Sequence, residues 1–207
     1  MATVLAVTVL AALSGCGDDA HRMASVQPAA TISVDAAPAK EDLEHVGGAL
    51  RDVRDAQTMH ELQQRFDALT TAASALSSSL ADIGARYEAT VSAGQLELSM
   101  RKQPQSSDLS TDAHLLPTAP VGNLALAMDS LLMCRDAYTK VSGSYRAHLA
   151  SMTQALGNDL SLTEKRNVDP TIATLLEDQL QLRSILTDVS AKSKAVIAEI
   201  DIVSSAP

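Results

Sequence analysis

The side chains that could bind a metal ion or transfer a proton are few and widely spaced. The histidines are His21, His45, His60, His114 and His148, and no two of them have the four-residue spacing that places two imidazoles on one helix face. The sequence also has no Cys-x-x-Cys pair, no Gly-rich phosphate loop and no Gly-x-Ser-x-Gly motif. We therefore expect no enzymatic activity, no catalytic residues, no metal site and no cofactor.

Other reactive side chains have a structural interpretation that is simpler than a chemical one. Carboxylates such as Glu177-Asp178 are expected to solvate polar helix faces. Met128, Met133 and Met152 fall on or next to an apolar stripe, where methionine usually fills gaps in a core. A copper-binding methionine cluster is the alternative for these three residues.

Cys134 lies between Leu131 and Tyr138 on the same stripe, and we expect a buried thiol that behaves as a small apolar group. The alternative is an exposed thiol that joins two copies of the chain in an oxidising compartment. With Cys16 assigned to a separate N-terminal motif, a single thiol remains, so no intramolecular disulfide holds the fold.

Composition favours a helical domain. The chain has 207 residues, of which 46% are hydrophobic and only 2% aromatic. Ala, Leu, Ser and Thr suit helices that pack closely through small side chains, and the scarcity of aromatic residues disfavours a β-sandwich. The net charge of −9 argues against a nucleic-acid partner and against a polybasic contact with a membrane.

Apolar residues spaced alternately by four and three predict long helices. In the first pattern they are Leu62, Phe66, Leu69, Ala73, Leu76, Leu80, Ile83 and Tyr87, and this helix extends at most over 41–102. In the second pattern they run from Leu124 to Leu156 through Met128, Leu131, Cys134, Tyr138, Val141, Tyr145, Leu149 and Met152, which predicts a helix over 122–156. The proline-containing residues 103–121 form the loop between them.

A third helix is predicted over 170–204, with Asp169 as its N-cap and Pro170 as its first residue. Its apolar stripe is Ile172, Leu176, Leu180, Leu182, Leu186, Val189, Val196, Ile200 and Val203, interrupted by Lys192 and Lys194. Just before it, Ser161 and Glu164 have capping-box spacing, which indicates a short turn.

These elements predict an all-α fold: an antiparallel bundle of three long helices with coiled-coil-like packing, over residues 41–207. Residues 41–60 either extend the first helix or fold back as a fourth. Gly47-Gly48 and the register shift from Ala56 to Met59 mark the points where the chain could bend.

The N-terminal segment has the pattern of a secretion signal. Residues 2–13 are apolar, too few to cross a bilayer as a helix, and end in Leu13-Ser14-Gly15-Cys16. This segment resembles the signal peptide and lipobox of bacterial lipoproteins, although it opens without the usual Lys or Arg. The resemblance implies that 1–15 is removed and that Cys16 is lipidated. A non-lipidated signal with an incidental cysteine, or an apolar N-terminus of a cytoplasmic protein, would also fit.

Residues 16–40 are then the lipidated cysteine and a disordered tether. Gly17 follows the cysteine, and in Gram-negative lipoproteins an Asp there is the familiar signal for retention in the inner membrane. The resemblance therefore favours an outer-membrane protein that faces the periplasm, if the source is Gram-negative.

Together these observations predict a non-catalytic envelope lipoprotein with a helical protein-interaction or structural role. Its expected partners are the membrane, through Cys16, and an envelope protein or a second copy of the chain. The alternative is a periplasmic domain that senses a small molecule or metal between its helices. Leu115-Leu116-Pro117 in the long loop either docks a partner or caps the end of the bundle.

Overall fold

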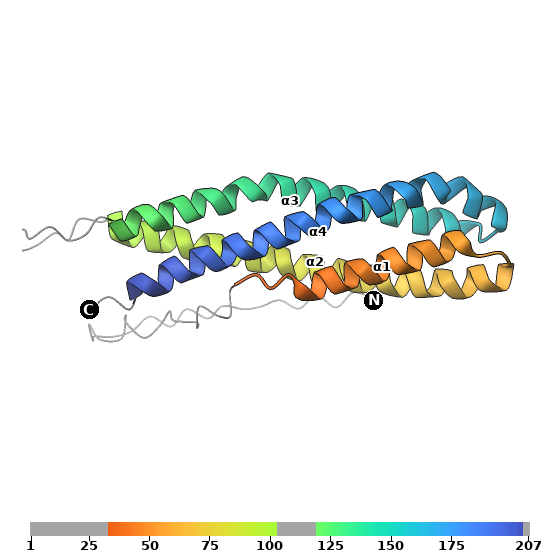
Figure 1. Cartoon of the computed structure of the whole chain (residues 1–207), viewed down its shortest axis with the longest axis horizontal. Helices are drawn as coiled ribbons and strands as arrows, with labels where there is room; N and C mark the ends of the chain where they lie inside the picture. Colours follow the sequence, from red (N-terminus) through yellow and green to blue (C-terminus); the bar gives the residue numbers. More distant parts are fainter. Residues whose placement is uncertain (1–32, 103–118, 205–207) are drawn as a thin grey trace, which may run out of the picture.

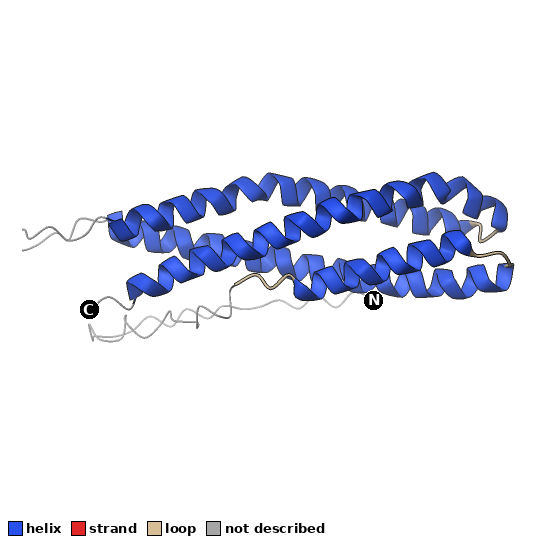
Figure 2. Ribbon diagram, in the orientation of Figure 1, coloured by secondary structure: helices blue, strands red, loops and turns tan. Residues whose placement is uncertain are grey.

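The computed structural model describes residues 33–102 and 119–204, which form an elongated bundle of four helices (Figure 1). In chain order these are α1 (Ala37–Asp55), α2 (Met59–Lys102), α3 (Ala119–Asn158) and α4 (Leu162–Ser204). Successive helices run in opposite directions, and the described part of the chain contains no strand (Figure 2). The predicted all-α bundle is confirmed, and residues 41–55 lie in a separate first helix, α1, which is the fourth member of the bundle.

α1 is less than half as long as the other helices. It has 19 residues, against 44 in α2, 40 in α3 and 43 in α4. At 1.5 Å per residue it is about 28 Å long beside partners of about 60 to 66 Å. α1 packs against α2 and α4 along one half of the bundle (Figure 1). One half therefore has four helices in cross-section, and the other half has three.

The chain turns between α1 and α2 at residues 56–58 because a capping box starts α2 there. The Glu61 N–H donates to the Thr58 hydroxyl over 3.2 Å, and the Glu61 carboxylate accepts the N–H groups of Gln57 and Thr58 at 2.8 and 3.2 Å. These two backbone hydrogen bonds lower the pKa of Glu61. Of the two alternatives for residues 41–60, extension of the first helix is wrong, and the chain breaks at the predicted register shift from Ala56 to Met59.

Gly47-Gly48, the other predicted point of bending, lies inside α1, which remains helical through both glycines. The two positions differ in their surroundings. A Cβ atom at Gly47 would overlap the side-chain amide of Gln179 on α4, whereas nothing lies within 4 Å of a Cβ at Gly48. Gly47 is therefore required by the close approach of α1 and α4 rather than by a turn.

α4 begins two turns earlier than predicted. The Ser161 hydroxyl accepts the Glu164 N–H over 3.1 Å and caps the helix, so the capping-box spacing starts α4 itself. The predicted start at Asp169 and Pro170 is wrong, because Pro170 lies inside the helix. Oδ1 of Asp169 is buried and accepts no hydrogen bond from a described residue. Because proline has no N–H, the carbonyl four residues before Pro170 loses its helical hydrogen bond. Pro170 is exposed, so solvent can reach that carbonyl.

The remaining boundaries also shift. α1 begins at Ala37 instead of 41, and α3 covers Ala119–Asn158 instead of 122–156, which shortens the loop predicted over 103–121. Val34, Ala36 and Ala39 are buried, so residues 33–40 belong to the folded domain and not to the tether predicted over 16–40.

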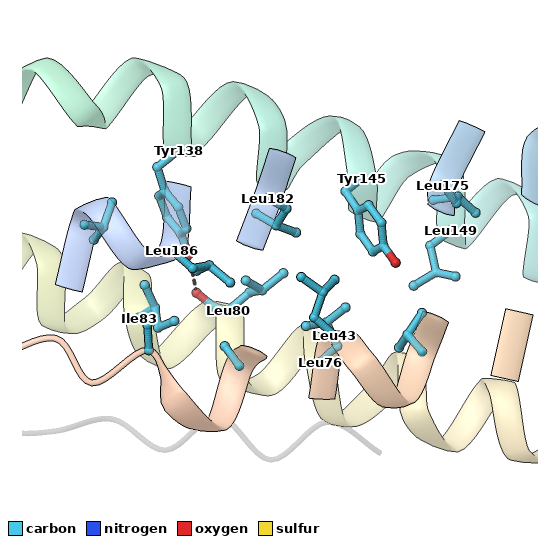
Figure 3. Packing of buried hydrophobic residues seen from close by; sticks show 14 of the residues in the cluster. Leu43, Leu76, Leu80, Ile83, Tyr138, Tyr145, Leu149, Leu175, Leu182 and Leu186 are labelled. Atoms are coloured by element: carbon cyan, nitrogen blue, oxygen red, sulfur yellow. Dashed lines mark hydrogen bonds between the residues drawn. The ribbon is translucent and has the colours of Figure 1, made fainter. Parts of the chain in front are cut away.

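The apolar stripes predicted for α2 and α3 form the core. All the predicted α2 and α3 residues are buried or half-buried in one continuous cluster, part of which is drawn in Figure 3. The stripe predicted for α4 is partly wrong. Leu180 is 72% exposed and Leu176 is half-buried, while Leu175, Gln179 and Ser193 face the core.

Alanine substitutions at the adjacent glycines of α1 should change the free energy of unfolding in opposite directions. Gly47→Ala should lower the free energy of unfolding by about 1 to 2 kcal/mol, because the Gln179 amide must move away from its hydrogen-bond partner. Gly48→Ala should raise it by roughly 0.5 to 1 kcal/mol, since alanine favours a helix and has room. Urea unfolding followed by circular dichroism measures both free energies. A change in the same direction for both variants would contradict the packing of Gly47 against Gln179.

Candidate functional site

Four of the five polar residues buried in the described bundle, all except Ser142, lie where α1 and the residues before it meet the other helices. The buried polar residues are Thr90, Ser142, Gln179, Ser190 and Ser193. A ligand site between the helices would be built from such groups at one level of the core, so their hydrogen-bond partners decide what they can bind.

Two of these residues, Ser190 and Ser193, bind the main chain of Val34, and Thr90 lies beside Ser193. We call this group the N-terminal clamp (Val34, Thr90, Ser190 and Ser193). The Val34 N–H donates to the Ser193 hydroxyl over 3.0 Å, and the Ser190 hydroxyl donates to the Val34 carbonyl over 2.8 Å. The hydroxyls of Thr90 and Ser193 lie 3.1 Å apart. The clamp satisfies both main-chain groups of a fully buried residue, at the point where the N-terminal segment joins the domain.

α1 itself is also held through its main chain. The Gln179 amide donates to the Leu43 carbonyl over 3.0 Å, and Lys165 Nζ donates to the Ala56 carbonyl over 3.1 Å. Arg65 on α2 donates to the carbonyl of Asp52 over 2.8 Å. Arg65 and Lys165 thus bind carbonyls at the C-terminal end of α1, where positive charge is favourable. The buried polar groups bind the chain itself.

The tyrosine hydroxyls differ in whether they have a partner. Tyr87 donates to the Leu131 carbonyl and Tyr138 to the Leu80 carbonyl, each over 2.8 Å. The Tyr145 hydroxyl is buried, and no described group lies within hydrogen-bonding reach of it (Figure 3). Burial raises the pKa of Tyr87 to about 12 and raises those of Tyr138 and Tyr145 as well. All three phenols therefore stay neutral at physiological pH.

Cys134 is buried, as predicted, and the alternative of an exposed thiol is wrong. Its Sγ accepts a hydrogen bond from Nζ of Lys192 on α4 at 2.9 Å, and this bond raises the pKa of the Lys192 ammonium. Lys192, which interrupts the predicted apolar stripe of α4, thus lies beside the core with its charged group on the thiol. Met128 and Met152 are buried as gap-filling residues, whereas Met133 is 81% exposed.

The histidines within the described ranges, His45, His60 and His148, are all exposed. His148 Nδ1 lies 3.5 Å from a carboxylate oxygen of Asp178, which links α3 to α4. Over residues 33–102 and 119–204, no three His, Cys, Asp or Glu side chains are close enough to hold a metal ion.

Grooves with polar side chains lie on the surface of the described bundle, and two of them border charged residues of neighbouring helices. One of about 630 Å³ lies between α1 and α2 and is lined in part by Asp42, His45 and Asp67. Another, of about 340 Å³, lies between α3 and α4 beside Lys140 and Asp178. Both are open to solvent, so a bound molecule would remain on the surface of the bundle.

Several predicted features lie outside the described residues. They are the lipobox with Cys16, the tether before Ser33, His21, His114 and the Leu115-Leu116-Pro117 segment. None of the described helices combines the length and the apolar character needed to span a membrane. Sequence reasoning missed the N-terminal clamp, because nothing in the local pattern links Val34 to two serines more than 150 residues away.

No protein-family model matches this chain, and neither curated proteins nor solved structures provide a match.

Removing the hydroxyl should change the stability of the protein in opposite directions at Tyr145 and at Tyr138. Tyr145→Phe should raise the free energy of unfolding by about 1 kcal/mol, because a buried hydroxyl without a partner costs desolvation energy. Tyr138→Phe should lower it by about 1 kcal/mol through loss of the bond to Leu80. Chemical denaturation compares them. A clear loss of stability in Tyr145→Phe would mean that its hydroxyl binds a water molecule or ligand.

The N-terminal clamp predicts local release of the chain. In the double variant Ser190→Ala/Ser193→Ala, both main-chain groups of Val34 lose their partners, at a cost of about 2 kcal/mol in total. Hydrogen exchange at residues 34–40 should accelerate while exchange in the middle of α3 stays slow. The control is Ser151→Ala, at an exposed serine of α3. Equal exchange rates in wild type and double variant would show that the clamp does not hold this segment.

Proposed function

We propose that this protein is a lipid-anchored envelope protein whose helical bundle acts by contacting other proteins, without catalysis. The observation that carries the proposal is Leu13-Ser14-Gly15-Cys16 at the end of a short apolar segment. A diacylglyceryl group on Cys16 would tether the domain to a membrane. Gly17 after the cysteine favours the outer membrane, with the domain facing the periplasm, if the cell is Gram-negative.

The clamp supports this proposal, because a tethered domain needs a firm junction with its tether. Val34 is the first buried residue of the described domain, 18 positions after Cys16. The N–H and the carbonyl of Val34 are both bound by serines of α4, so force on the tether would pass into α4 rather than unwind α1 from its end.

The use of the buried polar groups supports a non-catalytic role. Gln179, Ser190 and Ser193 all bind main-chain atoms of the segment that includes α1, which leaves them unavailable to a substrate. Exposed Leu126 and Met133 on α3 and Leu180 on α4 are instead available for contact with another protein.

A ligand-binding sensor domain is the second candidate, and the unpartnered hydroxyl of Tyr145 is the observation that favours it. A ligand held there would raise the melting temperature of the wild type and leave that of Tyr145→Phe unchanged. A screen of envelope metabolites by thermal shift with both proteins separates the two functions.

The anchor is tested by labelling with a radioactive fatty acid in a bacterial host. Wild type and Cys134→Ala should both incorporate the label and sediment with membranes, whereas Cys16→Ala should incorporate none. Intact mass of the purified proteins should show the added lipid on wild type and not on Cys16→Ala. Incorporation into Cys16→Ala, or its absence from wild type, would refute the proposed lipid anchor.

A further inference from the structure

The outward side of α4 carries a second heptad pattern, separate from the one that faces the core. We call it the α4 seam, and its residues are Ala173, Glu177, Leu180, Ser184, Thr187, Ala191, Lys194 and Ala198. They alternate in spacing between four and three, and all eight are exposed. This is the spacing with which one helix packs along another, and Leu180, at 72% exposure, is the largest apolar side chain on it.

The seam is nearly free of charge, and its two charged residues have opposite signs. Glu177 lies toward one end and Lys194 toward the other, 17 positions apart. Neither forms an ion pair with another described residue. Arg183 beside the seam is already paired with Glu44 of α1.

An antiparallel pairing of two such seams is complementary in both charge and size. With a two-fold axis midway between Ser184 and Thr187, Glu177 of each copy lies opposite Lys194 of the other. The same axis places Leu180 opposite Ala191, Ser184 opposite Thr187, and Ala173 opposite Ala198. A large side chain then meets a small one, and a two-fold axis repeats each pair on both sides of the interface.

We propose that a second copy of this chain packs antiparallel on the α4 seam through these pairs. The apolar surface on α3 does not offer the same match. Its outward residues Leu126 and Met133 alternate with the exposed charges of Asp129, Asp136 and Lys140, so that face is more highly charged than the α4 seam. The proposal uses only residues of α4 and does not depend on the lipid anchor.

Disulfide trapping of the purified full chain tests the register. In Leu180→Cys/Ala191→Cys the two cysteines of one chain are about 16 Å apart along the helix, too far to join within it. Mild oxidation should give a dimer with a 180–191 junction identified by mass spectrometry. The matched control is Leu126→Cys/Ala137→Cys, with the same separation on exposed positions of α3. No junction on α4, or equal yield from the control, would overturn the proposal.

Charge exchange tests the pairing in solution, with the full chain purified in detergent and its mass followed by sedimentation. Glu177→Lys and Lys194→Glu should each weaken the dimer by about tenfold or more, because like charges then meet twice across the axis. The double variant Glu177→Lys/Lys194→Glu should restore wild-type association. A wild type that is monomeric at every concentration, or a double variant as weak as the single ones, would refute the two-fold pairing. Circular dichroism verifies that each variant keeps its helical content.

Discussion

The bundle depends on the docking of α1, a 19-residue helix that cannot be expected to persist alone. Two glycines near its centre lower its helix propensity further. Its place is set by side chains that α2 and α4 extend to its main chain, at Leu43, Asp52 and Ala56, and by the clamp on Val34 just before it. These bonds, together with the buried face of α1, close the core over half the length of the other three helices.

The close approach of α1 and α4 explains why the core pattern of α4 could be predicted only in part. Hydrophobic spacing alone selects Leu180 over Gln179 as a core residue. The structure selects Gln179, because its amide finds the Leu43 carbonyl 136 residues away and Gly47 leaves room for it. A buried polar group is stable once it is hydrogen-bonded, and such a partner is visible only in three dimensions.

Local signals predicted well wherever their chemistry is local. The stripe from Leu62 to Tyr87 and the stripe around Leu131 needed only helical periodicity, and both are in the core. The start of α4 shows how two local signals can compete. Ser161 prevails over Asp169 and Pro170 because Leu162 and Val168 reach the core, so the extra turns bury apolar surface that outweighs an exposed proline. The capping box of Thr58 and Glu61 is equally local, and its spacing alone indicates the start of α2.

The clamp and the α4 seam together constrain how the proposed dimer would meet a membrane. Ser190 and Ser193 lie 4.5 and 7.5 residues from the proposed two-fold axis, so the two clamps of a dimer would be about 14 to 22 Å apart along the direction of the paired α4 helices. A flexible tether of the length that separates Cys16 from Ser33 would span on the order of 20 to 25 Å. Both anchors would then reach one bilayer from the middle of the assembly. Two tethers near the centre of the dimer favour bundles that lie along the membrane surface. If the bundles stood upright, this axis would point the equivalent ends of the two copies in opposite directions, one toward the membrane and one away from it.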